Sequence, residues 1–374
     1  MMQQAERAIF DFRRGQPVWI ADGGHGVFAL AVENLTPARL DQIRDHVQGP
    51  LALTITPSRA RALGLEPGNA PALRLPLRRD VAAGDLAALA SVVPDGSPPQ
   101  HGGALEPASE AEHAAMHLAR AGKLLPAALT AALDTADAEG LGPAVADGTF
   151  LRVGTEEALG INARPGLEMV QVSAAAVPLA DAAETRFMLF RESNGLLEHV
   201  AILIGPRSGW RTPVPVRLHS SCLTGDLFGS LRCDCGEQLR NSVRAIEDEG
   251  GGVLLYLAQE GRGIGLANKL RAYTLQDQGL DTVDADCSLG FSADERRYEA
   301  AVEMLHQLEV RRVSLFTNNP LKIEALEDGG ITVGDRRPLL GSVNAHNARY
   351  LSTKAEKAGH WLDELLSRTL PERR

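Results

Sequence analysis

The segment Val214–Leu239, VPVRLHSSCLTGDLFGSLRCDCGEQL, contains three of the four cysteines of the 374-residue chain. Cys233 and Cys235 are two residues apart, so in an extended segment both thiols face the same side. Cys222 can return to them if the turn-forming residues 224–226 fold back. Three thiolates without an evident fourth ligand are typical of a zinc site that keeps one position open for water, as catalytic zinc does. Small core residues are the alternative, but the charged residues among the cysteines favour a metal.

The composition is that of an ordinary globular chain, whose length suggests about two to three domains. Its 44% hydrophobic content can build real cores, and its net charge of −10 repels nucleic acid and anionic membranes. The N-terminus lacks a signal-peptide pattern, and no uncharged apolar run is long enough to span a bilayer. We therefore expect a soluble, cytoplasmic protein that binds neither nucleic acid nor membrane, in a reducing compartment that keeps the thiols free.

The N-terminal half alternates helical and strand patterns, which indicates an α/β or α+β fold. The pattern predicts a helix over residues 4–13, strands over 18–21 and 27–32, a helix from Pro37 to about Val47 capped by Thr36, and a strand over 51–55.

Further along this half, residues 93–107 are rich in proline and glycine and predict a surface loop, and residues 110–138 have a helical pattern. His101, His113 and His117 suggest a metal site, and the last two are four residues apart on one helix face. They lack an acidic partner at the spacing of metalloproteases, so we interpret them as solvent-exposed helix residues.

The C-terminal half is predicted to begin near residue 180 with a β-hairpin and to continue with two strand-loop-helix units. The predicted elements are strands over 187–190 and 199–204, a strand over 251–257 with the loop QEGRGIG (259–265) and a helix over 266–278, and a strand over 312–316 with a loop at 317–319 and a helix from Pro320. On the first of these helices we expect Leu266, Leu270 and Tyr273 to share one face. The two units imply one crevice at the carboxyl ends of their strands.

Two motifs of this half have structural alternatives. The glycine loop can bind phosphate through backbone NH groups with Arg262 nearby, but a tight turn explains its glycines equally well. In SADERRY, residues 292–298, Ser292 and Glu295 can form a capping box, with Asp294 suiting the helix dipole. Pattern alone leaves both interpretations open.

Together, over about residues 183–361, these motifs closely resemble GTP cyclohydrolase II, the riboflavin-pathway enzyme that opens the imidazole ring of GTP. The resemblance implies Cys222, Cys233 and Cys235 as ligands of one zinc ion per chain. It implies Tyr273 for catalysis, Asp294 as proton acceptor and Arg296 as a proposed nucleophile. The implied GTP contacts are Arg217, Leu218, His219, Ser220, Ser221, Gln238, Glu260, Gly261, Arg262, Thr282, Thr317 and Lys322. At Ser221 the family usually has a glutamate, so one contact differs.

The resemblance also implies the chemistry. A zinc-activated water attacks the guanine C8, formate is released, and magnesium and arginines hold the triphosphate while pyrophosphate departs. The expected product is 2,5-diamino-6-hydroxy-4-(5-phosphoribosylamino)pyrimidine, formed in the first step of riboflavin biosynthesis by a homodimer. A paralogue in pyrimidine catabolism and a non-enzymatic GTP-binding regulator are the alternatives. The intact Tyr273, Asp294 and Arg296 argue against both.

The N-terminal half resembles, in a few patterns, 3,4-dihydroxy-2-butanone-4-phosphate synthase: Arg14-Gly15, a strand pair and Thr36-Pro37. That family has an acid-rich segment between its first two strands, whereas residues 22–26 here are DGGHG, with a single acid. We therefore expect residues 1–180 to form a degenerate, non-catalytic domain and residues 181–374 the catalytic one, each with a mixed sheet and packed helices. His25 is interpreted as a turn residue.

Overall fold

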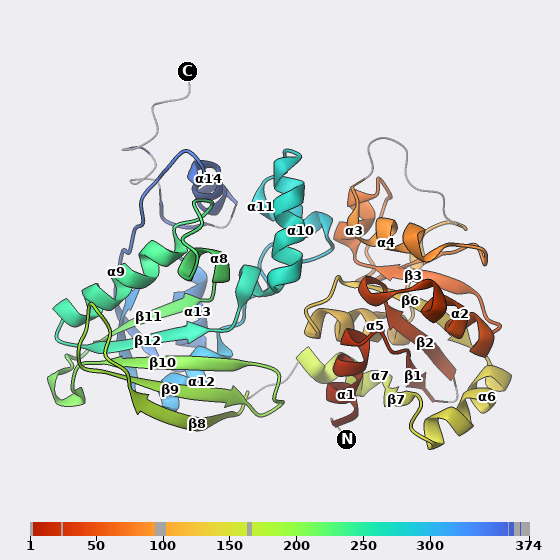
Figure 1. Ribbon diagram of the computed structural model, residues 1–374, viewed down its shortest axis with the longest axis horizontal. Helices are drawn as coiled ribbons and strands as arrows, with labels where there is room; N and C mark the ends of the chain where they lie inside the picture. The colour runs from red at the N-terminus through yellow and green to blue at the C-terminus, as the bar shows by residue number, and fades with distance from the viewer. Residues whose placement is uncertain are drawn as a thin grey trace. The chain divides into compact units, whose positions relative to one another are not determined.

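The computed structural model describes residues 3–23, 25–93, 102–162, 167–357, 359–362 and 367. The chain forms two compact units (Figure 1). The first unit comprises Met1–Arg164, Ala267–Leu280 and Asp284–Asp294, and the second comprises Pro165–Leu266, Asp281–Val283 and Glu295–Arg374. Within the described residues each unit has one seven-stranded mixed sheet with packed helices, which confirms the predicted fold class.

The first unit is built on a sheet in the order β5-β4-β3-β6-β2-β1-β7, antiparallel except for the pair β1 and β7. Its N-terminal elements are α1 (Gln3–Arg13), β1 (Val18–Asp22), β2 (His25–Ala31), η1 (Val32–Asn34), α2 (Pro37–His46), β3 (Leu51–Ile55), α3 (Pro57–Ala62), β4 (Leu73–Pro76), α4 (Ala83–Ser91), β5 (Glu106–Pro107), α5 (Glu110–Ala121), β6 (Ala127–Leu133), α6 (Thr135–Ala146), β7 (Leu151–Gly154), α7 (Thr155–Leu159) and η2 (Gly160–Asn162).

Several predicted elements of this unit are confirmed, including the helix from Pro37, where Thr36 Oγ1 accepts a hydrogen bond from Arg39 N at 3.3 Å. The helix predicted over residues 110–138 is wrong, because α5 ends at Ala121 and the alanine- and leucine-rich run Ala127–Leu133 is strand β6. This strand pairs with β2 on one side and β3 on the other. Both faces of β6 are largely buried, so it shows no alternation, and tertiary pairing overrides the helix propensity of alanine. Of the predicted loop, residues 94–101 lie outside the described residues.

The second unit has a sheet in the order β14-β13-β11-β12-β10-β9-β8. Its elements are β8 (Met169–Ala176), β9 (Thr185–Glu192), β10 (Glu198–Ile204), η3 (Arg207–Gly209), β11 (Val214–Ser220), α8 (Leu223–Asp226), α9 (Cys235–Asp248), β12 (Gly252–Leu257), η4 (Glu260–Gly263), α12 (Glu299–Gln307), β13 (Arg312–Phe316), α13 (Pro320–Asp328), β14 (Thr332–Arg337) and α14 (Ala348–Glu356). Between η4 and α12 come α10 (Leu266–Asp277) and α11 (Thr282–Ser288), most of whose residues belong to the first unit.

Parallel and antiparallel halves meet within this second sheet. The strands β14, β13, β11 and β12 are parallel, whereas β12, β10, β9 and β8 are antiparallel. The β9–β10 hairpin confirms the predicted one, although the sheet begins earlier, with β8. The predicted strands at 251–257 and 312–316 are β12 and β13, and they flank β11 as parallel neighbours. Their carboxyl ends therefore meet at one edge of the sheet.

Helices cover both faces of the second sheet. Val243 and Ile246 of α9 pack with Ile202, Ile204 and Leu254 on one face. On the other face, Met304 and Leu305 of α12 pack with residues of β11, β12 and β13. Alternate residues of β12 supply the two layers, because successive side chains of a strand point to opposite faces. None of the helices formed by described residues is long and apolar enough to span a membrane.

Candidate functional site

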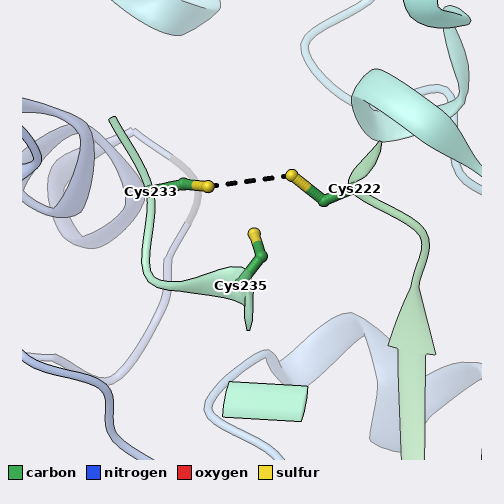
Figure 2. A group of neighbouring side chains, drawn as sticks. All are labelled: Cys222, Cys233 and Cys235. Carbon is green, nitrogen blue, oxygen red and sulfur yellow. Dashed lines mark hydrogen bonds between the residues drawn. The ribbon is translucent and has the colours of Figure 1, made fainter. Parts of the chain in front are cut away.

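The three cysteines lie together beside the carboxyl end of β11 (Figure 2). Cys222 follows the strand, Cys233 lies in the loop before α9 and Cys235 is the first residue of α9. The three Sγ atoms lie within 4.8 Å of one another, and those of Cys222 and Cys233 are 3.7 Å apart. Tetrahedral ligands at about 2.3 Å from one ion would place two sulfurs about 3.8 Å apart. The predicted cluster thus forms, with a spacing that fits one metal ion, although Cys235 begins a helix rather than continuing an extended segment.

Two glycines allow α8 and α9 to approach closely enough to form the cluster. A Cβ on Gly225 would lie 2.7 Å from Cys233 Sγ and 3.1 Å from Cys222 Sγ. A Cβ on Gly236 would lie 2.2 Å from the carbonyl oxygen of Gly225. Side-chain atoms at either position would occupy the space between the thiols or separate the helices.

The thiols of Cys233 and Cys235 resist ionisation in their buried, mutually packed arrangement. The neighbouring Cys222 thiol raises the pKa of Cys233 to about 11, with burial adding to the effect. The neighbouring thiols and then burial also raise the pKa of Cys235. A divalent cation reverses this preference, because it binds thiolates and stabilises their charge. Three sulfur donors suit a soft or borderline ion better than magnesium.

A buried network around Asp226 fixes the turn that carries Cys222. One Asp226 oxygen accepts hydrogen bonds from Cys222 N and Tyr256 OH, both at 2.9 Å, and His219 Nε2 lies 3.1 Å from the other. The rings of His219 and Tyr256, paired across β11 and β12, are stacked with centroids 5.6 Å apart. Burial lowers the pKa of His219 and raises that of Tyr256, so both neutral forms are favoured. Tyr256 was not anticipated, since an aromatic residue in an apolar strand is usually core.

The glycine loop after β12 is tied to the same turn. Glu260 Oε2 accepts from Leu223 N at 2.6 Å, and Oε1 accepts from Gly261 N at 3.0 Å. Gly261 and Arg262 have positive φ angles, of 63° and 59°. Such a conformation is uncommon for arginine and is seen mostly where surrounding structure enforces it.

The glycine loop also packs against the backbone that precedes Arg296. A Cβ on Gly263 would lie 2.7 Å from Glu295 O, and Glu295 N donates to Arg262 O at 3.1 Å. Two of the expected phosphate-binding arginines, Arg262 and Arg296, are thus carried by adjoining backbone segments of the second unit.

Asp234, between two of the cysteines, is held in a buried network. Gln238 Nε2 donates to one of its oxygens at 2.5 Å, and Lys354 Nζ of α14 lies 3.2 Å from the other. Arg217 donates from Nη2 to Gln238 Oε1 at 2.7 Å and from Nη1 to Phe316 O at 2.9 Å. Arg217 and Gln238, both expected substrate contacts, therefore also bind protein atoms that brace the cysteine loop. Lys354 was not anticipated as part of this region.

Buried polar atoms without a protein partner lie at or just past the ends of the three adjacent parallel strands. They are Ser220 Oγ at the end of β11, Gln259 Oε1 after β12 and Asn319 Nδ2 after β13, and among the described residues none has a hydrogen-bond partner. Buried polar atoms are normally satisfied, so unsatisfied ones that gather at one sheet edge indicate a ligand. Gln259 and Asn319 lay in the predicted loops but were not singled out from the sequence.

The other expected GTP contacts near this sheet edge lie either in the core or in the loops after the strands. Leu218 is buried in the core, and its carbonyl accepts from Lys322 Nζ at 2.6 Å. Thr317 Oγ1 accepts from Asn319 N at 3.0 Å and so shapes the loop after β13. Ser221 N donates to Leu257 O at 2.8 Å. Nothing in the structure explains why serine stands at this position.

Basic side chains gather in the second unit around His360. Burial, reinforced by the charges of Lys354, Arg296, Lys322 and Arg262, lowers the pKa of His360 to about 2. Lys322 Nζ and Arg296 Cζ lie 5.8 Å and 6.0 Å from the ring centre of Tyr298. A neutral histidine among four cations leaves a positive region suited to an anion.

The first unit carries two of the expected catalytic residues, Tyr273 on α10 and Asp294 after α11, whereas Thr282 belongs to the second unit. The helix predicted over residues 266–278 is confirmed as α10, with Leu266, Leu270 and Tyr273 spaced along one face, but this face is not the buried one. Leu270 is 50% exposed, and the buried residues of the helix are Asn268, Lys269, Ala272 and Leu275. This helix buries polar groups that have specific partners, which an apolar pattern cannot predict.

The capping-box interpretation of SADERRY is also wrong. Residues 292–298 are not helical, and α12 begins at Glu299 with Tyr298 as its N-cap. Ser292 and Glu295 therefore cap no helix, and Asp294 lies in an irregular segment rather than in a first helical turn.

The histidines of the first unit form no metal group among the residues that the structure describes. His113 and His117 are half-buried rather than solvent-exposed, and their rings meet edge to face with centroids 4.6 Å apart. His101 lies outside the described residues. Asp22 and His25 are exposed and pair across the tight β1–β2 turn.

Comparisons with known proteins agree with these motifs. The family model for GTP cyclohydrolase II matches residues 170–338. The chain is 43% identical over 366 residues to a protein named GTP cyclohydrolase-2 from Azospirillum brasilense, covering 96% of this chain and 94% of that protein. It is 42% identical over 363 residues to the protein of the same name from Xylella fastidiosa, covering 96% and 87%. A third, from Pseudomonas paraeruginosa, is 51% identical over 199 residues, which cover 53% of this chain and 96% of that protein.

Solved structures give a more distant likeness. The two-domain 3,4-dihydroxy-2-butanone 4-phosphate synthase RibBX from A. baumannii matches over 90% of this chain and 99% of its own, with 15% identity and a TM-score of 0.37. A cation-free 3,4-dihydroxy-2-butanone 4-phosphate synthase matches over 41% of this chain and 94% of its own, with 16% identity and a TM-score of 0.33.

Proposed function

The chain belongs to the GTP cyclohydrolase II family, and we propose that it is a zinc-dependent enzyme that hydrolyses GTP. The products are 2,5-diamino-6-hydroxy-4-(5-phosphoribosylamino)pyrimidine, formate and pyrophosphate, and the reaction opens riboflavin biosynthesis. One observation carries the proposal. The cysteine cluster, the unpartnered polar atoms of Ser220, Gln259 and Asn319, and a group of basic side chains all belong to the second unit, with the first two at one edge of its sheet.

Each part of this arrangement has a role in the proposed reaction. The cysteines hold zinc, which when bound supplies a Lewis acid that activates water for attack on the guanine C8. Ser220 and Asn319 offer polar atoms for the nucleotide, and Arg262 and Lys322 bind the triphosphate together with magnesium, a hard cation that prefers phosphate oxygens. Asp226 orients the turn of Cys222 and so keeps that thiol in place.

The test is turnover by the purified protein. With GTP, magnesium and a full complement of zinc, we expect one formate and one pyrophosphate per GTP consumed. Stripping the zinc with a chelator should abolish formate release, and adding zinc back should restore it. Binding of GTP without formate would instead identify a nucleotide-binding regulator. Turnover of a pyrimidine with no turnover of GTP would identify a catabolic paralogue.

We propose that Arg296 acts as a phosphate clamp. The family assigns it as a nucleophile, but a guanidinium stays protonated at ordinary pH, so covalent attack needs a nearby base and a dry site. The positive charges of Arg262 and Lys322 act on His360 together with that of Arg296. Such a group of cations favours electrostatic stabilisation of the departing pyrophosphate. Arg296→Lys should keep part of the activity, with a loss of roughly 10- to 1000-fold, and Arg296→Ala should lose more. Equal inactivity of both variants with GTP still bound would favour the covalent role.

For the N-terminal domain we propose no synthase activity. A synthase of the resembled family needs clustered acids to bind magnesium and move protons, and the β1–β2 turn offers only the exposed Asp22. The purified protein should therefore release no formate from ribulose 5-phosphate. Release at a rate comparable to that from GTP would restore a catalytic role to this domain.

We also propose that the enzyme works as a cytoplasmic homodimer. The family resemblance supports the dimer, and the clustered free thiols suit a reducing compartment. Sedimentation analysis of the zinc-loaded protein should give twice the chain mass of 39.9 kDa. A monomer that retains full activity would exclude the dimer as a requirement.

A further inference from the structure

The part of the C-terminal segment that carries α14 is anchored, before and after this helix, to the loop that follows β13. Before the helix, Leu339 O accepts a hydrogen bond from Asn318 Nδ2 at 2.6 Å. After the helix, Trp361 N donates to Asn318 O at 3.0 Å. Asn318 is buried, and all three residues belong to the second unit, as the cysteine cluster does. The helix is therefore fixed relative to the sheet edge at which the cluster lies.

Between these anchors the segment contacts the stretch that carries Cys233 and Cys235. Ser342 donates from its N and its Oγ to the two carboxylate oxygens of Glu237, at 2.7 Å and 2.8 Å. A Cβ on Gly341 would lie 2.7 Å from Asp234 Cβ and 3.1 Å from Asp234 Oδ2. The backbone at residues 341–342 thus packs directly against the first turn of α9 and the residue between the two cysteines.

Lys354 of α14 adds a buried ion pair to this contact. Its Nζ lies 3.2 Å from Asp234 Oδ1, and the two side chains are 13% and 0% exposed. The same Nζ lies 4.3 Å from the ring centre of Tyr350, four residues earlier on the helix. Solvent screens a buried pair little, and removal of one partner leaves the other charge buried without compensation. The pair therefore restrains Asp234 strongly.

Asp234 transmits this restraint to two thiols because it lies between Cys233 and Cys235 in the chain. A displacement of Asp234 moves the backbone on both sides, and with it both sulfur atoms. Its other oxygen accepts from Gln238 Nε2 at 2.5 Å, but Gln238 lies on α9 itself and moves with that helix. Lys354 comes from a separate helix, so its contact ties the cysteine-bearing stretch to another part of the second unit.

We propose that Lys354 is a positioning residue of the zinc centre, which through Asp234 holds Cys233 and Cys235 at the spacing that one metal ion requires. The inference rests on the proposed function for the identity of the metal. It gives α14 a specific role, although this helix supplies none of the proposed ligands or nucleotide contacts.

The first test measures zinc affinity of the full-length chain by competition with a chromophoric chelator. Lys354→Met should lower the affinity about tenfold, the lower end of the range seen when the support of a metal ligand is lost. Lys354→Arg keeps the charge and should recover part of the loss. The matched control is Lys357→Met, because Lys357 lies just after α14 and its Nζ is 2.5 Å from Asp281 Oδ2. This change also breaks a lysine ion pair, but not one with the cysteine-bearing stretch, so zinc affinity should be unchanged.

A double-mutant cycle separates positioning through Asp234 from a direct effect of the lysine charge on the thiolates. In an Asp234→Ala background the partner of Lys354 is absent, so adding Lys354→Met should change zinc affinity by less than about threefold. A loss of about tenfold that persists in this background would refute the proposal, because the lysine would then act without Asp234.

Cobalt(II) in place of zinc reports the geometry of the site, because its visible absorption depends on the arrangement of the ligands. We expect a shifted and weakened spectrum in Lys354→Met and a wild-type spectrum in Lys357→Met. If Lys354→Met does not fold, Gly341→Ala provides the second variant, since its Cβ displaces Asp234 from another side. It should show the same loss of zinc affinity and the same spectral change.

The outcomes distinguish this inference from the proposed function. A wild type that binds zinc but releases no formate from GTP refutes the proposed reaction, while the zinc affinities of the variants still decide the positioning role. A wild type that binds zinc, with Lys354→Met and Gly341→Ala equal to the Lys357→Met control in affinity and spectrum, refutes the positioning role alone. A wild type that binds no zinc refutes both.

Discussion

Arg59 in the first unit and Arg217 in the second are both buried, and burial lowers the pKa of each to about 10. Their partners differ. Nε and both terminal nitrogens of Arg59 donate to backbone carbonyls, whereas Arg217 binds Phe316 O and Gln238 and leaves its Nε without a partner among the described residues. Arg59 therefore has a structural role, because it satisfies backbone carbonyls at helix ends. Arg217 lies on the strand that leads to the cysteine cluster, where hydrogen-bonding capacity remains.

The same contrast extends across the two units. Unpartnered buried atoms of the first unit include Gln4 Oε1, Trp19 Nε1, Arg44 Nε and Asp137 Oδ2, each on a different element. In the second unit such atoms of Ser220, Gln259 and Asn319 lie at or just past the ends of neighbouring parallel strands, and those of Arg217 and His219 lie on β11, one of these strands. Isolated unsatisfied atoms occur in most proteins, so the shared location rather than the mere presence of such atoms indicates a ligand site.

The largest effect on the proposed site of the second unit is expected from removal of a thiol. Cys233→Ser should bind less than a tenth of the zinc of the wild type and lose about 1000-fold or more in GTP turnover, because two thiolates do not complete the site. Metal analysis after gel filtration and a formate assay measure both effects.

The matched control is Cys287→Ser, which changes the one cysteine outside the cluster. It should retain one zinc per chain and wild-type turnover. Full zinc in Cys233→Ser, or zinc loss in Cys287→Ser, would contradict the assignment of the second unit as the metal-binding one.

The next largest effect is expected on zinc affinity when a methyl group is added at Gly225. In Gly225→Ala the new Cβ lies 2.7 Å from Cys233 Sγ, so the thiols must move apart. We expect zinc affinity to fall by about 10- to 100-fold, the range seen when the support of a metal ligand is disturbed. Competition with a chromophoric chelator gives the affinity.

The control for this change is Gly209→Ala in the same unit. A Cβ at Gly209 meets its nearest atom at 3.5 Å, an ordinary contact, and the residue has no positive φ. Zinc affinity should therefore be unchanged. Equal affinities in the two variants would show that the glycine does not set the spacing of the thiols.

The sequence predicts the second unit better than the first, for a physical reason. Its segment β13-loop-α13 carries strong local signals, since Asn319 caps α13 and Pro320 opens it, and apolar strands precede both predicted loops. The three cysteines are close in sequence, so their meeting requires only a local turn. In the first unit, β6 consists of alanine and leucine, and its strand conformation comes from pairing with β2 and β3, which no local pattern encodes.

The sequence does not predict hydrogen-bond partners that are distant along the chain. Tyr256 reaches Asp226 from a neighbouring strand, and Lys354 reaches Asp234 from a helix 120 residues away. The polar face of α10 is another example, since Asn268 is buried because of a carbonyl 145 residues distant. These contacts depend on the assembled fold, whereas motif spacing reports only what lies near in the chain.

The smallest expected effect concerns His360 and the pH dependence of stability. Its pKa is about 2 in the folded protein against an ordinary value of 6.5. Above pH 6.5 both states are neutral and the full stability is present. As the pH falls below 6.5 the unfolded state gains a proton that the folded state cannot accept, so stability is lost. Between pH 7.5 and 5.5 this loss is about 1 kcal/mol.

Replacing His360 should therefore flatten the pH profile. In His360→Gln the fall in the free energy of unfolding between pH 7.5 and 5.5 should be smaller by about 1 kcal/mol than in the wild type, as measured by urea titration. His346→Gln, at an exposed histidine, should leave the profile unchanged. Acid release of zinc affects all three proteins alike and cancels in the comparison. A His360→Gln profile as steep as that of the wild type would mean that His360 becomes protonated in the folded state, and the cationic cluster around it would then lack the strength inferred for binding triphosphate.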